Sequence, residues 1–180
     1  QVWNGKDSSG NIVPDGSYTY TIDAIDPQTN SSSPEVSGTL TVDNTLPQAS
    51  LTEPASNATL SGSVSIKGSF SDTNLWYAYL YYGVGTNPTQ WYGLAYLGSA
   101  LTEPMPLYNW DTKTLANGDY VIRLEVYDQA YNVKRVDLPV KLYNVNIYSF
   151  SCRPTYISPN ADGQQDTTTF TASITSSSNW

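Results

Sequence analysis

The sequence predicts an all-β protein whose strands form antiparallel β-sandwiches. Three observations support this fold class. The 15 Tyr and 5 Trp, against 3 Phe, give an aromatic content that is typical of strands. Apolar and polar residues alternate with a period of two in several segments. Segments rich in Gly, Pro, Asn and Asp separate these alternating runs at short intervals, as turns do between short strands. We expect no long helix.

The clearest predicted strand is Asp119–Tyr127, which follows a turn at Asn117-Gly118. Because side chains alternate between the two faces of a strand, one face should be buried and the other should face solvent. The expected buried set is Tyr120, Ile122, Leu124 and Val126, and the expected solvent-facing set is Val121, Arg123 and Glu125. This strand therefore predicts a sheet with one wet face.

A similar stretch occurs near the start of the chain. It begins at Trp3, passes through Asp15-Gly16 and continues to Asp26. The residues that replace the buried set are Tyr18, Tyr20, Ile22 and Ala24. The recurrence predicts an internal repeat whose copies lie about one domain apart.

Residues 1–43 are predicted to contain too few strands for a closed sandwich. We expect strands at Gln1–Trp3, Ser17–Ile25 and Val36–Val42, with a turn at Lys6–Gly10. A meander of this size is marginal alone. We therefore interpret residues 1–43 as the C-terminal half of a sandwich. Asn44 to Pro47 then forms a linker, because Pro47 favours an extended conformation in the residue before it.

Residues 44–143 are predicted to form a complete domain. The expected strands are Ala49–Thr52, Ala58–Leu60, Val64–Ser71, Leu75–Gly83, Trp91–Gly98, Leu107–Trp110, Asp119–Tyr127 and Val133–Leu142. The expected turns are Pro54–Asn57, Gly83–Pro88, Glu103–Pro106 and Asn117-Gly118. This density of short strands is typical of an immunoglobulin-like sandwich. The paired cysteines of antibody domains are absent, because Cys152 is the single cysteine.

Residues 144–180 are predicted to be the N-terminal half of a further sandwich. We expect a strand at Val145–Ser151, a polar loop from Pro154 to Asp166, and a strand at Thr167–Ile174. Cys152 is expected to be a half-buried small residue or to form a bridge between chains. Because Gln1 opens directly into a predicted strand, we expect that a leader was removed and that the chain is part of a longer one.

Two segments resemble a known family. One segment is Ser158-Pro159-Asn160-Ala161-Asp162-Gly163 with Asp166, and the other consists of Trp3–Asn11 and Pro14–Tyr20. Together they resemble the immunoglobulin-like domain of flagellar hook-capping proteins. They also resemble the related terminal domains of secreted and gliding-associated bacterial surface proteins. In that family the two parts occur in the opposite order. The central domain resembles bacterial immunoglobulin-like surface repeats through Trp110-Asp111-Thr112, Leu115, Gly118 and Tyr120. The resemblance implies a bacterial extracellular or cell-surface protein that is non-catalytic and repeated or assembled.

The reversed order leaves two organisations open. Half-sandwiches expose sheet edges that accept further strands. Copies of the chain could complete one another head to tail by strand complementation and form a filament. Alternatively, the chain is part of a tandem array of repeats in one polypeptide. Both organisations predict a structural rod whose role is mechanical and adhesive.

Composition disfavours several other classes. With 16 acidic and 8 basic residues the net charge is −8, so we expect no nucleic-acid partner. No apolar run is long enough for a membrane span. The chain has no His and no phosphate-binding or dinucleotide-binding glycine pattern, which argues against an enzyme and against an organic cofactor.

One loop is a candidate calcium site. Asn160, Asp162 and Asp166 surround Gly163 and offer oxygen ligands of the kind that Ca²⁺ prefers. The alternative is that these side chains cap backbone amides in a tight turn.

A cluster of aromatic residues is a candidate interface or glycan-binding surface. The candidates are Tyr77, Tyr79, Tyr81, Trp91 and Tyr92. Alternation places the first three on one face of a strand and sends Trp76, Ala78, Leu80 and Tyr82 to the other. The exposed rings could stack on sugars, which would make the chain a carbohydrate-binding or accessory adhesion module, could form a protein interface, or could simply decorate the sheet.

Overall fold

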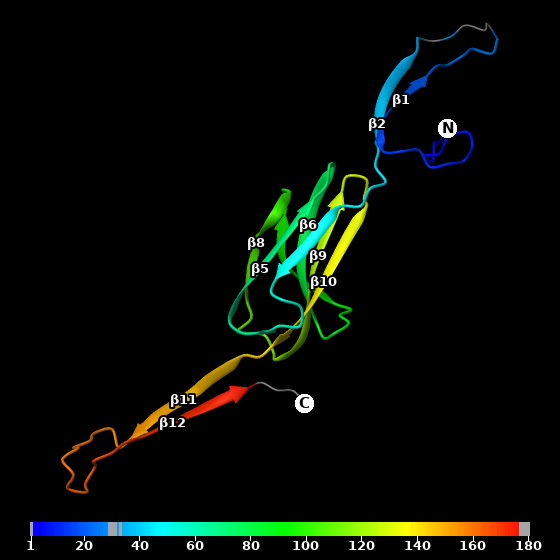
Figure 1. The fold of residues 1–180 in the computed structure, drawn as a ribbon. Coiled ribbons are helices and arrows are strands. Elements are labelled where there is room, and N and C mark those ends of the chain that lie inside the picture. Colours follow the sequence, from blue (N-terminus) through cyan, green and yellow to red (C-terminus); the bar gives the residue numbers. More distant parts are fainter. Residues whose placement is uncertain (1, 29–31, 33, 177–180) are drawn as a thin grey trace.

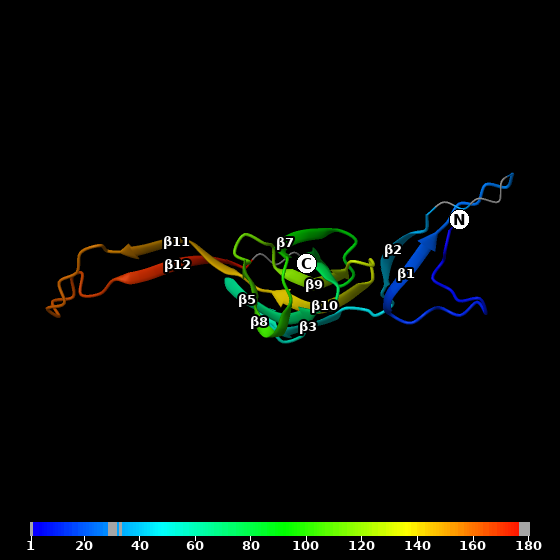
Figure 2. The same ribbon diagram turned by 90° about the horizontal axis from the view of Figure 1, so that it is seen from above.

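The computed structural model describes residues 2–28, 32 and 34–176, and this part of the chain contains strands and no helix. A central sandwich of eight strands carries a two-stranded hairpin at each of two opposite ends, which makes the molecule elongated (Figures 1 and 2). Within the described residues, no helix has the length and apolar character needed to cross a membrane.

The central sandwich consists of two sheets. Its strands are β3 (Gln48–Glu53), β4 (Thr59–Leu60), β5 (Ser63–Ser71), β6 (Leu75–Val84), β7 (Trp91–Leu97), β8 (Leu101–Asp111), β9 (Gly118–Asp128) and β10 (Val133–Leu142). One sheet has the order β4-β10-β9-β6-β7 and the other has the order β3-β5-β8. All neighbours are antiparallel except the short β4, which runs parallel to β10. The predicted all-β, immunoglobulin-like sandwich is confirmed.

The core lies between these two sheets. As predicted, Tyr120, Ile122, Leu124 and Val126 of β9 are buried. They meet residues of the facing sheet, among them Ile66, Phe70 and Trp110. Each such side chain contributes about 1.5–3 kcal/mol when it is fully buried. The alternation of β9 therefore fixes which face of the five-stranded sheet is internal.

The opposite face of β9 is drier than predicted. Val121 is only 5% exposed, and the side chains of Arg123 and Glu125 are 21% and 13% exposed. Trp91 of β7 lies against Arg123, Tyr79 of β6 is the register partner of Glu125, and Val121 lies between Gly83 and Pro139. The expectation of a solvent-exposed face was wrong, because the alternation within one strand does not show which side chains of the neighbouring strands lie beside it.

The predicted turn at Glu103–Pro106 was also wrong, because these residues continue β8. Among the described strands, β8 is at the edge of its sheet and pairs with β5 alone, and its register shifts at Lys67 and again near Phe70. A proline lacks the amide proton that a central strand needs, but edge strands and bulges tolerate it. Pro104 and Pro106 therefore do not interrupt the strand.

The N-terminal hairpin consists of β1 (Gly16–Ile22) and β2 (Val36–Val42). Its predicted first strand, Gln1–Trp3, is not formed by Val2 and Trp3, and Gln1 lies outside the described residues. Tyr20 and Ile22, which correspond to core residues of β9, are 47% and 63% exposed, because no second sheet within the described residues faces them.

The C-terminal hairpin consists of β11 (Val145–Arg153) and β12 (Thr169–Ser176). Phe150 and Phe170 stack on one another with their ring centroids 6.0 Å apart, and both are 67% exposed. Cys152 is a half-buried free thiol. The hairpin thus presents apolar side chains that no other sheet of the described structure covers.

The two hairpins β1–β2 and β9–β10 share a tyrosine corner. The Tyr120 hydroxyl donates to the carbonyl oxygen of Ala116 at 2.9 Å, and the Tyr18 hydroxyl donates to that of Pro14 at the same distance. In each case the acceptor lies four residues upstream. This bond marks the start of the sixth strand in immunoglobulin-like sandwiches. Strand β1 is therefore the structural counterpart of β9.

The same two hairpins end in the same asparagine anchor. The backbone N–H of Asn144 donates to Asn117 Oδ1 at 2.6 Å, and that of Asn44 donates to Asp15 Oδ1 at 2.6 Å. Asn117 and Asp15 each stand directly before the glycine that opens the hairpin. The anchors are 100 positions apart, so the sequence repeat is also a structural repeat.

Candidate functional site

The outer side of the five-stranded sheet forms a surface that we call the aromatic face. It is made of Tyr77, Tyr79 and Tyr81 from β6, Trp91 and Tyr96 from β7, and Tyr127 from β9. Tyr79 is the centre of the group, with its ring centroid 5.3 Å from Tyr77, 5.6 Å from Tyr81 and 5.2 Å from Tyr96. The ring planes are tilted by 39° to 67° in these pairs. The rings therefore pack against one another's edges and do not form one flat platform.

Not all of the predicted aromatic candidates share this face. Tyr77, Tyr79, Tyr81 and Trp91 are brought together, whereas Tyr92 lies on the inner side of the sheet. There Tyr92 stacks on Tyr82, with centroids 5.1 Å apart and planes 21° apart, and Tyr82 in turn contacts Trp110. Two adjacent residues of a strand point to opposite faces, so Trp91 and Tyr92 cannot act on the same partner.

A row of alternating charges crosses the aromatic face, and we call it the charge row. Arg123 binds Asp137 through two hydrogen bonds of 2.6 and 2.7 Å. Arg123 also lies 3.8 Å from Glu125, and Glu125 accepts a hydrogen bond of 2.6 Å from Arg135. Asp137 lies across from Arg123 and Arg135 lies across from Glu125 on the neighbouring strand, so the order along the contacts is Asp137, Arg123, Glu125, Arg135. The Arg123 guanidinium lies 3.9 Å above the ring of Trp91, at cation–π distance, which joins the row to the aromatic residues.

The pKa values reflect these contacts. The hydrogen bond to Asp137 raises the pKa of Arg123, and the hydrogen bond to Glu125 raises that of Arg135. Burial, followed by the nearby Glu125 carboxylate, raises the pKa of Tyr81. The two arginines of the charge row therefore keep their positive charge over the physiological range, and the raised pKa of Tyr81 keeps its phenol neutral there.

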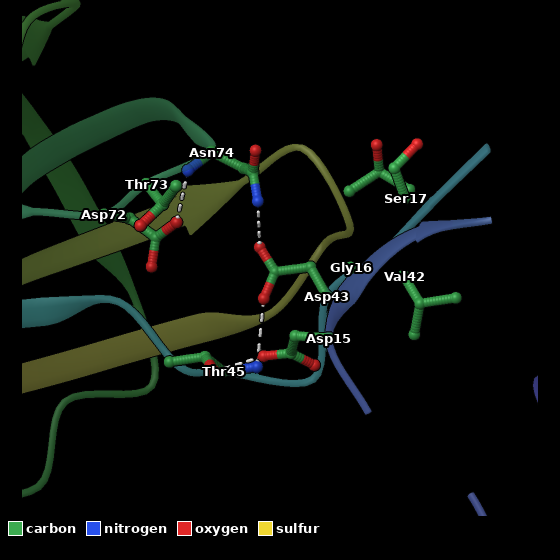
Figure 3. Close-up of a pocket in the computed structure, with 10 residues that line it drawn as sticks. Asp15, Gly16, Ser17, Val42, Asp43, Thr45, Asp72, Thr73 and Asn74 are labelled. Carbon is green, nitrogen blue, oxygen red and sulfur yellow. Dashed lines mark hydrogen bonds between the residues drawn. The ribbon is translucent and has the colours of Figure 1, made fainter. Parts of the chain in front are cut away.

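A second polar region lies where the N-terminal hairpin meets the central sandwich, and we call it the junction (Figure 3). Asp43 follows β2 and accepts a hydrogen bond of 2.7 Å from the side chain of Asn74. Its backbone carbonyl accepts one of 3.0 Å from the side chain of Asn132. Asn74 and Asn132 belong to loops of the central sandwich, so these bonds attach the linker to it.

The junction contains the residues that could hold a divalent cation. Carboxylate oxygens of Asp43, Asp72 and Asp128 lie within 4.8 Å of one another. These carboxylates already accept hydrogen bonds from amide groups; those to Asp128 come from the backbone of Ala130 and from Asn132. The junction is therefore held by hydrogen bonds between protein groups. Sequence reasoning missed it, although each of the three aspartates follows or ends a strand at the same end of the sandwich.

The loop proposed for calcium has its oxygens engaged in turn formation. Asp166 accepts bonds from the amides of Ala161 and Gly163 at 3.0 and 2.8 Å. Asp162 accepts bonds from the amide of Gln164 and the side chain of Asn160, and these bonds lower its pKa. This is the arrangement expected for the capping alternative. Calcium binding here stays a prediction; thermal unfolding with calcium and with a chelator tests it, because a bound ion raises the midpoint.

Asn144 forms a buried hub at the opposite end of the sandwich. Its side chain is 4% exposed and donates to the carbonyl oxygen of Thr112 at 2.7 Å. It also accepts the amide proton of Gly62 at 3.1 Å. The hub ties the turn before β5, the end of β8 and the end of β10 together. Sequence reasoning missed this residue too; its signal is an Asn two positions after the last strand of each hairpin.

Comparisons with known proteins give limited information. No family model matches the chain, and no curated protein matches it. Among solved structures, the chain is similar to the endo-beta-1,4-mannanase from Thermotoga petrophila, with 12% identity and a TM-score of 0.40 over 57% of this chain. It is also similar to an engineered protein, with 18% identity and a TM-score of 0.36 over 53% of this chain. The chain spans about a fifth of the length of each, since the matches cover 21% and 20% of them.

Proposed function

We propose that this chain is a non-catalytic structural segment of a bacterial cell-surface fibre, built from immunoglobulin-like units joined end to end. The observation that carries the proposal is the repeated corner, in which the tyrosine bond and the asparagine anchor of β9–β10 recur in β1–β2. A chain that repeats both the strands of its sandwich and the asparagine anchors that follow them has the organisation of a rod of units.

The positions at which the two hairpins leave the central sandwich suit a mechanical role. The two hairpins leave the central sandwich at opposite ends, so tension along the chain passes through the sandwich (Figure 1). Tension at these ends shears the ladders of β3 with β5 and of β10 with β9. In shear, several backbone hydrogen bonds must break together, and each contributes about 0.5–1.5 kcal/mol. Such a unit resists extension better than one whose bonds open singly.

The exposed hairpin faces support assembly by completion of half-sandwiches. In the central unit, β3–β5 packs across from β9–β10. Hairpin β11–β12 has the position of the first pair, and β1–β2 has that of the second. Each therefore offers the apolar face that the other would cover, either in a second copy or in a neighbouring repeat. The extracellular location and adhesive role rest on the resemblance to bacterial surface proteins.

Light scattering and electron imaging of the 180-residue chain, refolded at micromolar concentration, separate the two organisations. Rods of many copies support strand complementation between chains. Monomers support a tandem array within one polypeptide.

Force spectroscopy of the chain tests the mechanical role itself. We expect one discrete unfolding event from the central unit. Extension without such an event would contradict a mechanical role. Antibody labelling of intact and lysed cells tests the location, and labelling that requires lysis would contradict a cell-surface fibre.

A further inference from the structure

The aromatic face has the composition of a protein interface. Within the described part of the chain, no second layer covers the outer side of the five-stranded sheet, whereas β3-β5-β8 covers its inner side. Tyr, Trp and Arg are the residue types most enriched where proteins associate. This face places six aromatic residues around two arginines.

The face is electrically neutral on an acidic protein. The chain carries a net charge of −8, which opposes association of two copies. On the outer side of the sheet each acidic group has a basic partner; the pairs are Asp137 with Arg123, Glu125 with Arg135 and Asp119 with Lys141. The facing surfaces of two copies therefore add no repulsion of their own to that of the net charge.

The charge row is also complementary to itself. Its signs alternate as minus, plus, minus, plus along Asp137, Arg123, Glu125 and Arg135. A two-fold axis that lies in the interface and crosses β9 between Arg123 and Glu125 reverses the order in the second copy. Arg123 then faces Glu125 of the second copy, and Asp137 faces its Arg135. Opposite charges meet at all four positions, as an isologous interface requires.

We propose that the aromatic face pairs with the same face of a second copy, so that two rods associate side by side. The contact is distinct from the end-to-end joints. A polysaccharide fits this face less well, because the rings are tilted against one another and because the charged groups that could bind hydroxyls are bonded to each other.

Sedimentation velocity of the whole chain over a concentration series tests the pairing. We expect a reversible dimer. The double variant Glu125→Arg with Arg135→Glu keeps the net charge and the ion pair within the chain, but it changes the sign order to minus, plus, plus, minus. Under the two-fold axis like charges then meet, so we expect dimerisation to weaken by at least about tenfold.

Two further variants make the test specific. Adding Asp137→Arg and Arg123→Asp to the double variant restores strict alternation and should restore the dimer. The matched control is Glu53→Lys with Lys67→Glu, which reverses an ion pair of 3.0 Å on the other sheet and should leave the dimer unchanged. Tyr96→Lys is a second disrupting variant; its side chain is 61% exposed, so the fold should persist while an unpaired charge enters the interface.

Several results would overturn the proposal. These are a monomer at every concentration, and a dimer that survives both the double variant and Tyr96→Lys. Association that is lost in Ile22→Lys or Ile174→Lys but not in the face variants would place the contact at the hairpins, in favour of head-to-tail assembly. A monomer that co-sediments with insoluble cellulose or chitin through Tyr79 would assign the face to a polysaccharide.

Discussion

Asn44 and Asn144 occupy the same position in the repeat but differ in burial. Asn144 bonds residues from three segments of the central sandwich, whereas Asn44 is exposed and bonds Val13 and Asp15 of its own hairpin. Removing a buried amide leaves its partners without hydrogen bonds, which is more costly than the net value of the bonds themselves.

Asn144→Ala should therefore lower the free energy of unfolding by about 2–4 kcal/mol. Asn44→Ala, as the matched control, should lower it by less than about 1 kcal/mol, since water replaces the lost bonds. Urea denaturation of both variants measures the difference. Equal effects would show that the hub does not hold the sandwich together.

The tyrosines of the sandwich should make the stability of the folded chain fall at alkaline pH. Burial raises the pKa values of Tyr81, Tyr120 and Tyr127 above the ordinary value of 10.0. Above that pH the unfolded chain loses phenolic protons that the folded chain retains, so stability is complete below pH 10 and falls as the pH rises further. Thermal unfolding followed by phenolate absorbance measures this decline. Tyr120→Phe should reduce the slope, and an unchanged slope would assign the effect to other groups.

At the level of single strands, Gly68 of β5 lies close against the backbone of β3. A Cβ at Gly68 would collide with the backbone carbonyl of Ser50 and press on the side chain of Leu107. Gly68→Ala should therefore separate the two strands and lower the free energy of unfolding by about 1–3 kcal/mol. Gly93→Ala is the control, because nothing lies within 4 Å of its Cβ position. Similar midpoints for both variants would contradict the close approach.

The predicted strands agree best with the structure where alternation is strict. The strands Val36–Val42 and Val133–Leu142 have the predicted bounds, and the buried set of β9 is as expected. The edge strand β8 was predicted too short, because Pro104 and Pro106 resemble turn residues and only the absence of a partner on that side makes them acceptable. Local pattern does not reveal which strand is at an edge.

The candidate sites were harder to predict. Alternation on β6 correctly separated Tyr79 from Leu80, because neighbouring residues of a strand face opposite sides. The charge row was not predicted, since Arg123 and Asp137 belong to different strands and meet only through the register of β9 and β10. The junction likewise depends on loops that are distant in the sequence, and Asp43 lies 31 positions from Asn74.

For the whole molecule, the attachment of the N-terminal hairpin should weaken at acid pH. Hydrogen bonds from the Thr45 side chain and the Asn44 amide lower the pKa of Asp15 below its ordinary value of 3.8. A lowered pKa means that the anchor is intact above pH 3.8 and weakens as the pH falls through the folded value.

Amide hydrogen exchange of Asn44 should therefore accelerate below pH 3.8, relative to the intrinsic rate, while the amide of Asn144 remains protected. The acceptor for the Asn144 amide is the side chain of Asn117, which does not titrate, so this second anchor is an internal control. Asp15→Asn should remove the dependence at Asn44. Acceleration at both anchors would indicate global unfolding instead.

The spacing of the two anchors has a consequence for recombination between gene copies. Because Asn44 and Asn144 end equivalent hairpins and are 100 positions apart, an exchange between misaligned gene copies at these codons inserts or removes one whole unit. The backbone N–H of the asparagine keeps a side-chain oxygen of Asp15 or Asn117 as its acceptor, and the order of the strands on either side is preserved. In the proposed fibre, recombination of this kind would change the length in steps of one sandwich and would reuse an existing type of connection.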